Sequence, residues 1–367
     1  MRIFTFGSSL TSSYWNGAAT YYRGMYKSLA ALGYEITFAE PDIFQRQQNR
    51  DTQHIAYANV IVYQTPVEIP RLLEMAKKCD LIIKHSGVGA DDQILERVVL
   101  LARTAMNRIV FWDVDAPATL ARTEENGADP FRSLIPQYDY IFTYGGGASV
   151  VERYRRLGAK NCTPIYNGLD PETHHPVARD PKLACDLAFV GHRLPDRERR
   201  VEQFFLRAAE LAPDLEFILG GEGWGGRLLP PNVRWIGHVP SNDHNRVNCS
   251  ARMVLNINRD CMANVGFSPP TRVFEAAGAG ACLITDAWRG VDQFFVPGAE
   301  ILVAASADEI VAFLRNLSPD DAARIGTGMR QRALKDHTYE LRARRFHRVF
   351  EGQPEAEPEL NLAESRT

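Results

Sequence analysis

Short apolar runs alternate with amphipathic stretches along most of the chain. The first run, residues 2–6, predicts a strand, and a stripe of apolar residues at helical spacing between Tyr22 and Leu32 predicts a helix that ends at Gly33. Residues 36–38 predict a second strand. Because this order makes a βαβ unit, we expect the loop at residues 7–17 to lie at the carboxyl edge of a parallel sheet.

The same alternation continues to residue 157, stops, and restarts at residue 186. The first half predicts further strands over 60–63, 80–84, 108–112 and 140–143, and helices over 66–78, 91–105 and 149–157. The second half predicts strands over 186–190, 215–219, 233–236, 251–257, 281–285 and 301–303, and helices over 197–211, 308–317, 319–334 and from 339 to 350. The pattern therefore predicts an α/β protein made of two doubly wound, Rossmann-like domains that face each other across a cleft.

Turn formers and prolines interrupt the alternation at residues 164–176. We interpret this segment as the linker between an N-terminal domain at residues 1–165 and a C-terminal domain that begins at residue 166. The adjacent His174 and His175 are expected to be exposed there. The last residues, 351–367, are polar with several Glu and Pro, which predicts disorder.

The second domain contains the most informative stretch, residues 264–286. Ser268 suits the N-cap of a helix and Pro269 its first position, while Gly278 and Gly280 predict its end. Asp286 then follows at the carboxyl end of a buried strand. We expect a short helix with free N–H groups at its start, followed by a tight turn and a strand.

The start of that helix predicts an anion site. Gly266 precedes it, and Arg272 and Glu275 lie one turn apart on it, which provides a cation and a sugar-hydroxyl acceptor beside free amides. The alternative is an ordinary capped helix on which Arg272 and Glu275 form a solvated i, i+3 pair. Spacing alone does not separate these two interpretations.

Polar groups also follow two strands of the first domain. His85 ends one of them, and its ring is either a general base or a satisfied structural histidine. Asp113 and Asp115 follow the other strand as Asp-Val-Asp, a pattern that either holds a divalent metal or braces the turn before Pro117. These three residues are the candidates for deprotonating an acceptor hydroxyl.

Composition narrows the classes of partner. The net charge is −3 with a pI near 6.3, so no global field favours nucleic acid or an anionic membrane. The six cysteines are scattered without metal-ligand spacing, which indicates reduced thiols and a cytoplasmic protein. The first residues read as a strand, and no apolar run is long enough to span a bilayer, so we expect peripheral membrane contact at most.

Several motifs together resemble glycosyltransferases of the GT-B fold. The second half resembles group 1 glycosyltransferases, most closely the branch named after the spore maturation protein CgeB. The motifs are Tyr-Trp-Asn-Gly-Ala-Ala-Thr-Tyr-Tyr-Arg (14–23), Asp-Val-Asp-Ala-Pro (113–117), Asn-Gly-Leu-Asp (167–170), Phe-Val-Gly (189–191), Ser-Pro-x-x-Arg-x-Phe-Glu-Ala-Ala (268–277), Phe-Phe-x-Pro-Gly-x-Glu (294–300) and His-Thr-Tyr (337–339). The resemblance covers roughly residues 1–350. It implies a donor domain at 166–336 and a terminal helix at 337–350 that packs back on the N-terminal domain.

The resemblance also implies roles for residues of the donor domain. Glu275 is expected to accept hydrogen bonds from ribose hydroxyls, the helix start at 268–271 to face a diphosphate, and the backbone at Val239 to meet the nucleobase. Arg193 and Arg197 stand where basic residues contact phosphate. The predicted donor site is completed by Arg259, Gly266, Ser268 and Arg272.

These roles imply transfer of a sugar from a nucleoside-diphosphate sugar to an acceptor hydroxyl, with no bound metal or other cofactor. The acceptor, whether glycan, lipid-linked or small molecule, is not specified, and no nucleic-acid partner is expected. Many retaining members have a glutamate where this chain has Phe267, so the stereochemical outcome stays open. The alternative functions are a non-hydrolysing sugar-nucleotide 2-epimerase and a binding protein that senses nucleotide sugars without turnover.

Overall fold

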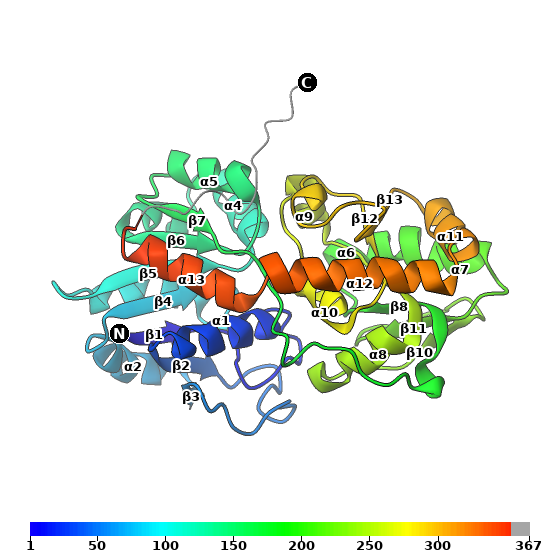
Figure 1. The fold of residues 1–367 in the computed structure, drawn as a ribbon. Helices are drawn as coiled ribbons and strands as arrows, with labels where there is room; N and C mark the ends of the chain where they lie inside the picture. The colour runs from blue at the N-terminus through cyan, green and yellow to red at the C-terminus, as the bar shows by residue number, and fades with distance from the viewer. Residues whose placement is uncertain (354–367) are drawn as a thin grey trace. The chain divides into compact units, whose positions relative to one another are not determined.

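The structure is a computed structural model, and it describes residues 1–353. Its chain divides into two compact units (Figure 1). Unit 1 comprises Met1–Asn167 and Arg342–Phe346, and unit 2 comprises Gly168–Leu341 and the residues from His347 onward. The predicted domain limits, 1–165, 166–336 and 337–350, stay predictions. Of the tail predicted to be disordered, 351–367, residues 354–367 lie outside the described part.

Unit 1 contains a seven-stranded sheet in the order β3-β2-β1-β4-β5-β6-β7, with every pair of strands parallel. The strands are β1 (Arg2–Phe6), β2 (Glu35–Pro41), β3 (Asn59–Tyr63), β4 (Leu81–His85), β5 (Arg108–Asp113), β6 (Tyr140–Thr143) and β7 (Cys162–Pro164). The central strands are buried along nearly their whole length, because helices cover both faces of a parallel sheet. This burial on both faces explains why these strands have near-continuous apolar sequences.

The helices of unit 1 connect successive strands. They are α1 (Ala19–Ala31), α2 (Ile69–Ala76), α3 (Asp92–Val98), α4 (Ala116–Glu125) and α5 (Gly147–Arg156), with single-turn segments η1 (Pro66–Glu68), η2 (Val99–Ala102), η3 (Pro130–Ser133) and η4 (Ile135–Gln137). The helix predicted over 66–78 is η1 followed by α2, and the helix predicted over 91–105 is α3 followed by η2.

A segment from the other end of the chain completes the core of unit 1. Within α13 (Tyr339–Phe350), Phe346 is fully buried, and its ring stacks on Trp112 of β5 with centroids 5.2 Å apart. The same ring lies 5.0 Å from Phe142 of β6. Arg342, 2% exposed, donates a hydrogen bond from Nε to the carbonyl of Asn167. The last helix therefore contributes aromatic packing to the first sheet.

Unit 2 repeats the same topology with six parallel strands in the order β10-β9-β8-β11-β12-β13. They are β8 (Cys185–Val190), β9 (Phe217–Gly220), β10 (Val233–Trp235), β11 (Ala251–Asn256), β12 (Leu283–Asp286) and β13 (Leu302–Ala304). In both sheets the third, second and first strands of the unit precede the fourth, fifth and sixth, which is the doubly wound order. The predicted fold of two Rossmann-like α/β units is confirmed.

The helices of unit 2 fill the connections. They are α6 (Pro195–Val201), η6 (Glu202–Leu206, a π-helical segment), α7 (Arg207–Leu211), α8 (His244–Ser250), α9 (Asp260–Val265), α10 (Thr271–Ala279), α11 (Ala307–Asn316), α12 (Pro319–Asp336) and part of α13, with single-turn segments η5 (Pro181–Leu183), η7 (Ser241–Asp243) and η8 (Val291–Gln293). Among the described residues, no helix combines the length and the apolar content that crossing a bilayer requires.

Four short elements were not predicted: α4, α8, α9 and β7. The helix α8 has seven residues and α9 has six, so neither repeats an apolar stripe long enough to be recognised. The strand β7 has three residues, and its only strand partner is β6. Pairing with a neighbouring strand, which local sequence does not record, makes this segment a strand.

Candidate functional site

The strand order of unit 2 reverses between β8 and β11. In doubly wound sheets, ligands bind outside the carboxyl ends of the strands at this switch point. Val190 and Gly191 lie at the carboxyl end of β8, and Asn256 lies at that of β11. A ligand at this switch point would therefore lie beside these two strand ends.

Arg272 of α10 reaches both strand ends. Its Nε donates to the carbonyl of Val190 at 2.7 Å, and its Nη1 donates to Oδ1 of Asn256 at 3.0 Å. Its guanidinium also lies over the ring of Phe189, 5.1 Å from the centroid. Two hydrogen bonds and a ring face leave this half-buried side chain one well-defined position at the switch point.

Arg197 of α6 approaches the same place from the other side. It donates a hydrogen bond to the carbonyl of His192, and its guanidinium lies 5.7 Å from the centroid of Phe189. A Cβ built on Gly191 would lie 2.9 Å from Nη2 of Arg197 and 3.0 Å from Nη2 of Arg272. The two guanidinium groups therefore converge on the backbone at Gly191.

No carboxylate within residues 1–353 forms a salt bridge with either guanidinium. Burial lowers the pKa of Arg272, and it lowers that of Arg197 to about 9 with a further contribution from the positive charge of Arg272. Both shifts mean that the positive charge costs more free energy in the unliganded protein than it does in water. A bound anion would offset this cost, and planar guanidinium groups suit phosphate oxygens.

Glu275 lies one turn after Arg272 and is 6% exposed. Its Oε2 is 3.1 Å from Nδ1 of His244, the first residue of α8. Burial alone would raise the pKa of the carboxyl, but the charge and hydrogen bond of His244, with the charges of His174 and Arg272, together outweigh burial and lower it. The structure therefore contradicts the solvated Arg272–Glu275 pair: Glu275 is buried, and its ion-pair partner is a histidine from another helix.

The predicted start of the helix at Ser268 and Pro269 is wrong. The helix α10 begins at Thr271, with Pro270 at the N-cap and no side-chain cap. Because a residue before proline is disfavoured in the helical region, Pro270 keeps Pro269 extended and delays the start by two residues. Ser268 instead donates from Oγ to the carbonyl of Gly266 at 2.9 Å.

The end of α10 follows the prediction at Gly280 but not at Gly278, which lies inside the helix. Gly280 takes the left-handed conformation, with φ of +72°, immediately after the last helical residue, and its N–H bonds to the carbonyl of Ala277. A glycine is also required at Gly266, in the loop before α10. Gly266 has φ of +77°, and a Cβ there would lie 2.6 Å from the carbonyl oxygen of Arg289. Glycines thus shape both ends of this stretch.

Two further predicted donor residues, Arg193 and Arg259, form salt bridges with carboxylates. Arg193 forms a salt bridge with Glu198 at 2.6 Å, and Arg259 forms one with Asp196 at 2.5 Å. The charge of Arg259 lowers the pKa of Arg197, so Arg259 lies close enough to add to the positive field at the switch point. The charge of Arg193 is not among the influences on the pKa of Arg197 or Arg272.

Backbone from three loops packs around Gly191. The indole of Trp224 donates to its carbonyl at 2.9 Å, and Gly221, with φ of +110°, would place a Cβ 2.4 Å from the same oxygen. Val239, buried, lies against Gly220 at the end of β9, where a Cβ on that glycine would be 2.8 Å away. The glycine-rich stretch 220–226 therefore allows β9 and the Gly191 loop to approach closely.

His192, Asn256 and His244 belong to this site and were not predicted. His192 accepts from the N–H of Glu222 at 3.0 Å, and burial with the nearby charges of His238 and Arg197 lowers its pKa to about 4. His192 directly follows the Phe-Val-Gly motif, which was the available signal. His244 lies in no motif, so only its contact with Glu275 identifies it.

The expectation that His174 is exposed is wrong. His174 is 2% exposed, and its ring lies 6.3 Å from the ring of His244. The helix α10 passes close to it, because a Cβ on Gly278 would lie 2.5 Å from the carbonyl oxygen of His174. Packing against α8 and α10 buries this part of the segment, whereas His175 is exposed as expected.

In unit 1, His85 lies in an aromatic cluster. It is 1% exposed, its Nε2 is 2.6 Å from the hydroxyl of Tyr26, and its ring is 4.4 Å from that of Tyr22. Burial lowers its pKa well below the usual value, which keeps the ring neutral. These contacts are those of a histidine that organises the packing beneath the carboxyl edge of the first sheet.

Asp113 is buried and saturated with hydrogen bonds. Its Oδ1 accepts from Ser86 at 2.7 Å and Thr119 at 3.1 Å, and its Oδ2 accepts from Tyr154 at 2.5 Å. Burial raises its pKa in spite of these bonds. Asp115, at the N-cap of α4, is partly exposed. Of the three candidate bases, only Asp115 has access to solvent.

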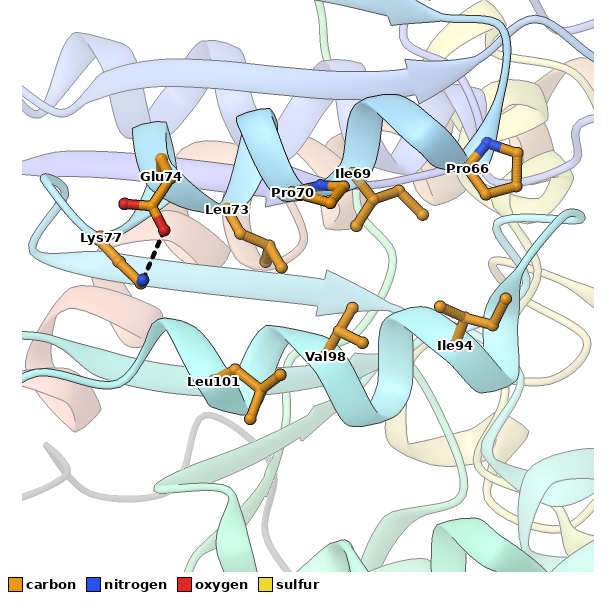
Figure 2. A pocket seen from close by; sticks show the side chains of 9 residues that line it. All are labelled: Pro66, Ile69, Pro70, Leu73, Glu74, Lys77, Ile94, Val98 and Leu101. Atoms are coloured by element: carbon orange, nitrogen blue, oxygen red, sulfur yellow. Dashed lines mark hydrogen bonds and ion pairs between the residues drawn. The ribbon is translucent and has the colours of Figure 1, made fainter.

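A cavity of about 340 Å³ lies elsewhere in unit 1, between α2 and the α3–η2 segment (Figure 2). Its lining is apolar except for Glu74 and Lys77, whose charges are paired at 2.6 Å. Figure 2 shows Leu73 from one helix and Val98 and Leu101 from the other pointing into this groove. It offers no group for sugar or phosphate chemistry.

Comparisons with known proteins identify the fold. Residues 197–348 match the family model described as "Glycosyl transferase-like". A search of curated proteins found no match. Sucrose-phosphate synthase from Thermosynechococcus elongatus superposes with a TM-score of 0.68 at 14% identity, covering 96% of this chain and 98% of that chain.

Two further solved structures are similar over the same extent. Anabaena HepE, in complex with UDP-glucose, has a TM-score of 0.66 at 12% identity, covering 96% of this chain and 100% of that chain. An alpha-glucosyltransferase, in complex with UDP and DNA, has a TM-score of 0.68 at 12% identity, covering 96% and 98%. This chain therefore has the fold of the GT-B glycosyltransferases, and its residues 197–348 are similar to the glycosyl transferase-like family model.

Proposed function

We propose that the protein transfers a sugar from a nucleoside-diphosphate sugar to an acceptor hydroxyl. The observation that carries the proposal is the convergence of Arg197 and Arg272 on Gly191, at the switch point of the second sheet. Two guanidinium groups without carboxylate partners suit the two phosphates of the donor. The same groups stabilise the charge that develops on the leaving diphosphate.

With the diphosphate bound by Arg197 and Arg272, we assign the remaining donor contacts as follows. The first turn of α10, from Thr271, offers N–H groups to a phosphate, Glu275 accepts from the ribose hydroxyls, and the backbone at Val239 meets the nucleobase. Gly266 and Ser268 shape the loop that leads into α10. Arg259 adds positive charge, and Arg193 reaches a phosphate only by leaving Glu198.

Uridine is the base that the solved structures favour. HepE was solved with UDP-glucose and with UDP, and the alpha-glucosyltransferase with UDP. The acceptor, whether a glycan, a lipid-linked compound or a small molecule, is assigned to unit 1, and we propose a cytoplasmic enzyme of the CgeB-like branch. Nucleic acid is not proposed as the acceptor, since the net charge is −3.

Chemistry at the acceptor requires a base if the reaction inverts. The bond from the anomeric carbon to the diphosphate oxygen breaks, the bond to the acceptor oxygen forms, and the hydroxyl proton goes to the base. We assign this role to Asp115, because it is the candidate with solvent access. Asp113 and His85, both buried, support that edge of the sheet.

Donor binding provides the first test. Thermal unfolding is measured with UDP, GDP, ADP and the corresponding monophosphates, because a ligand that binds only the native state raises the melting temperature. We expect one nucleoside diphosphate to stabilise the wild type and to stabilise Arg197→Gln less. Arg315→Gln, which removes an exposed pair with Asp214, is the control. The proposal fails if no nucleoside diphosphate stabilises the protein.

Turnover separates transfer from the alternative functions. Nucleotide sugar is incubated alone and with pooled acceptors, and the sugar is followed by NMR. A glycosyltransferase releases UDP faster when the acceptor is present. Formation of a 2-epimer without acceptor would establish an epimerase instead, and tight binding without any product would establish a binding protein.

We expect turnover to proceed without a divalent cation. Arginines and helix N–H groups neutralise the leaving diphosphate in this proposal, so that no cation has to bridge the phosphates. The measurement compares initial rates with EDTA and with added manganese. Activity that disappears in EDTA and returns with manganese would show that a metal, with Asp113 and Asp115 as its candidate ligands, takes part.

A further inference from the structure

We infer that His244 is a positioning residue for the donor: it ties the ribose-binding carboxylate of Glu275 to the backbone of Val239 beside the nucleobase. The inference rests on the proposed function, since it assigns a partner to the residue proposed to bind ribose. It explains how two recognition elements from different parts of the chain come into register.

The contacts of His244 link α8, α10 and the loop after β10. Its Nδ1 lies 3.1 Å from Oε2 of Glu275, and its ring also hydrogen-bonds the backbone of Val239. Val239 lies five residues before His244, whereas Glu275 lies 31 residues after it. No local motif therefore contains all three residues. Carboxylate and carbonyl oxygens both accept, and an imidazolium has a donor for each.

The charged groups around the ring favour this protonated form. Glu275 faces it from α10 and raises its pKa against the effect of burial, whereas Arg272 from the same helix opposes protonation. His174 faces it from the segment 164–176 and His192 from the loop after β8, and burial lowers the pKa of both. Glu275 is thus the partner that most favours protonation, and His244 is positively charged at a pH below its raised pKa.

The pair keeps Glu275 able to accept. Burial acts to raise the pKa of this carboxyl, and the charge and hydrogen bond of His244 are the leading influences that lower it, ahead of His174 and Arg272, so His244 favours the ionised form with its greater acceptor capacity. A carboxylate accepts about four hydrogen bonds, so the bond to His244 is compatible with bonds from two ribose hydroxyls. The close approach of α10 to His174 at Gly278 holds the helix that carries Glu275 in place.

The test compares UDP with 2′-deoxyuridine diphosphate by isothermal titration. In His244→Ala we expect affinity for UDP to fall roughly tenfold, about the value of one charge-assisted hydrogen bond, and affinity for the deoxynucleotide to fall much less. His244→Asn keeps a neutral donor and is expected to lie between. The control is His175→Ala, an exposed histidine of the segment 164–176, which should leave both affinities unchanged.

A purely structural role gives a different result. If His244 only packs α8 against α10, both nucleotides lose the same factor and their ratio stays at the wild-type value, which overturns the inference. The Asn variant guards against misfolding, because it preserves size and a donor. Melting temperatures of all variants are measured in parallel.

The pH profile supplies a second readout. Because the pKa of His244 is raised, its charge is present below that pKa and lost as pH rises through it. The ratio of UDP to deoxynucleotide affinity should therefore fall with rising pH in the wild type and stay flat in His244→Asn. Titration of the diphosphate itself cancels in this ratio. A flat wild-type profile contradicts the inference.

Failure of the inference and failure of the proposed function are distinguishable. If the wild type binds no nucleoside diphosphate, the proposed function falls and the inference falls with it. If the wild type binds UDP and Glu275→Ala weakens that binding while His244→Ala does not, only the inference is wrong.

Discussion

At the scale of residues, the second unit keeps two arginines charged at an energetic cost. Arg197 is 9% exposed and lies beside Arg272, so burial and like charge both act against its protonation. By contrast, most of the arginines that form a salt bridge with a carboxylate do so at the surface, where such a pair contributes little to stability. An unpaired cation pair that converges on backbone is the arrangement expected of an anion site, because the ligand supplies the missing charge.

Replacing Glu275 by alanine should weaken donor binding. Two ribose hydroxyls would face an apolar wall, a loss of roughly 2–4 kcal/mol if hydrogen bonds to charged groups contribute about 1.5–3 kcal/mol each. Affinity for UDP should then fall by about two orders of magnitude, measured by titration calorimetry. A Glu275→Ala variant that binds UDP normally but melts earlier would place the donor site elsewhere.

Replacing Arg272 by glutamine should discriminate between phosphates. If the guanidinium reaches the distal phosphate, affinity for UDP falls by roughly ten- to a hundredfold, while affinity for UMP changes less. The bonds to Val190 and Asn256 are also lost, so the melting temperature is measured beside affinity. Equal losses for UDP and UMP would show that Arg272 only joins the strand ends. Arg315→Gln again serves as the control.

At the scale of elements, α10 carries two of the proposed donor residues, and local sequence defines both of its ends. Two prolines delay its start to Thr271, and Gly280 ends it in the left-handed conformation. Arg272 and Glu275, at i and i+3, both lie near its amino end. The helix therefore presents a cation and a carboxylate from one rigid turn, and its neighbours determine what each meets.

Gly278 on the same helix is predicted to be intolerant of a side chain. A Cβ there would lie 2.5 Å from the carbonyl oxygen of His174 and 2.5 Å from Cδ1 of Leu169. Since the backbone oxygen cannot move aside as a flexible side chain would, Gly278→Ala should cost about 1–3 kcal/mol of unfolding free energy. Denaturant unfolding measures this.

The matched control is Gly127→Ala in a loop of unit 1, where nothing lies within 4 Å of the added Cβ. That variant should keep wild-type stability. If Gly278→Ala is equally stable, α10 does not approach the 164–176 segment as closely as described, and the rigid placement of Glu275 loses its support.

At the scale of the whole molecule, residues from both ends of the chain build unit 1. Phe346, near the carboxyl end, is fully buried against aromatic rings of β5 and β6. Phe346→Ala should therefore destabilise unit 1 by about 3–5 kcal/mol, the usual cost of removing a buried phenyl group. Phe346→Leu, which retains most of the volume, should cost less.

Unfolding followed by the near-ultraviolet signal of the buried tryptophan Trp112 checks this prediction, because that residue stacks on Phe346. The Ala variant should lose the signal at lower denaturant than the wild type. If its transition is unchanged, α13 is dispensable for the first sheet, and its role is confined to unit 2.

The sequence by itself determined the succession of elements. Apolar runs at 2–6, 108–112 and 251–257 became strands of parallel sheets, since burial on both faces requires continuous apolar residues. Gly280 marked the end of α10, because the left-handed conformation there favours glycine. These properties depend on neighbours within a few residues, so a single sequence records them.

Only the tertiary structure decided which groups meet and which are buried. His244 reaches Glu275 across 31 residues, and Arg272 reaches Val190 across 82. Asp113 and Asp115 look alike in sequence, yet one is saturated with hydrogen bonds and the other reaches solvent. Packing of distant elements sets these distances and burials, and with them the pKa values, so local pattern contains no record of them.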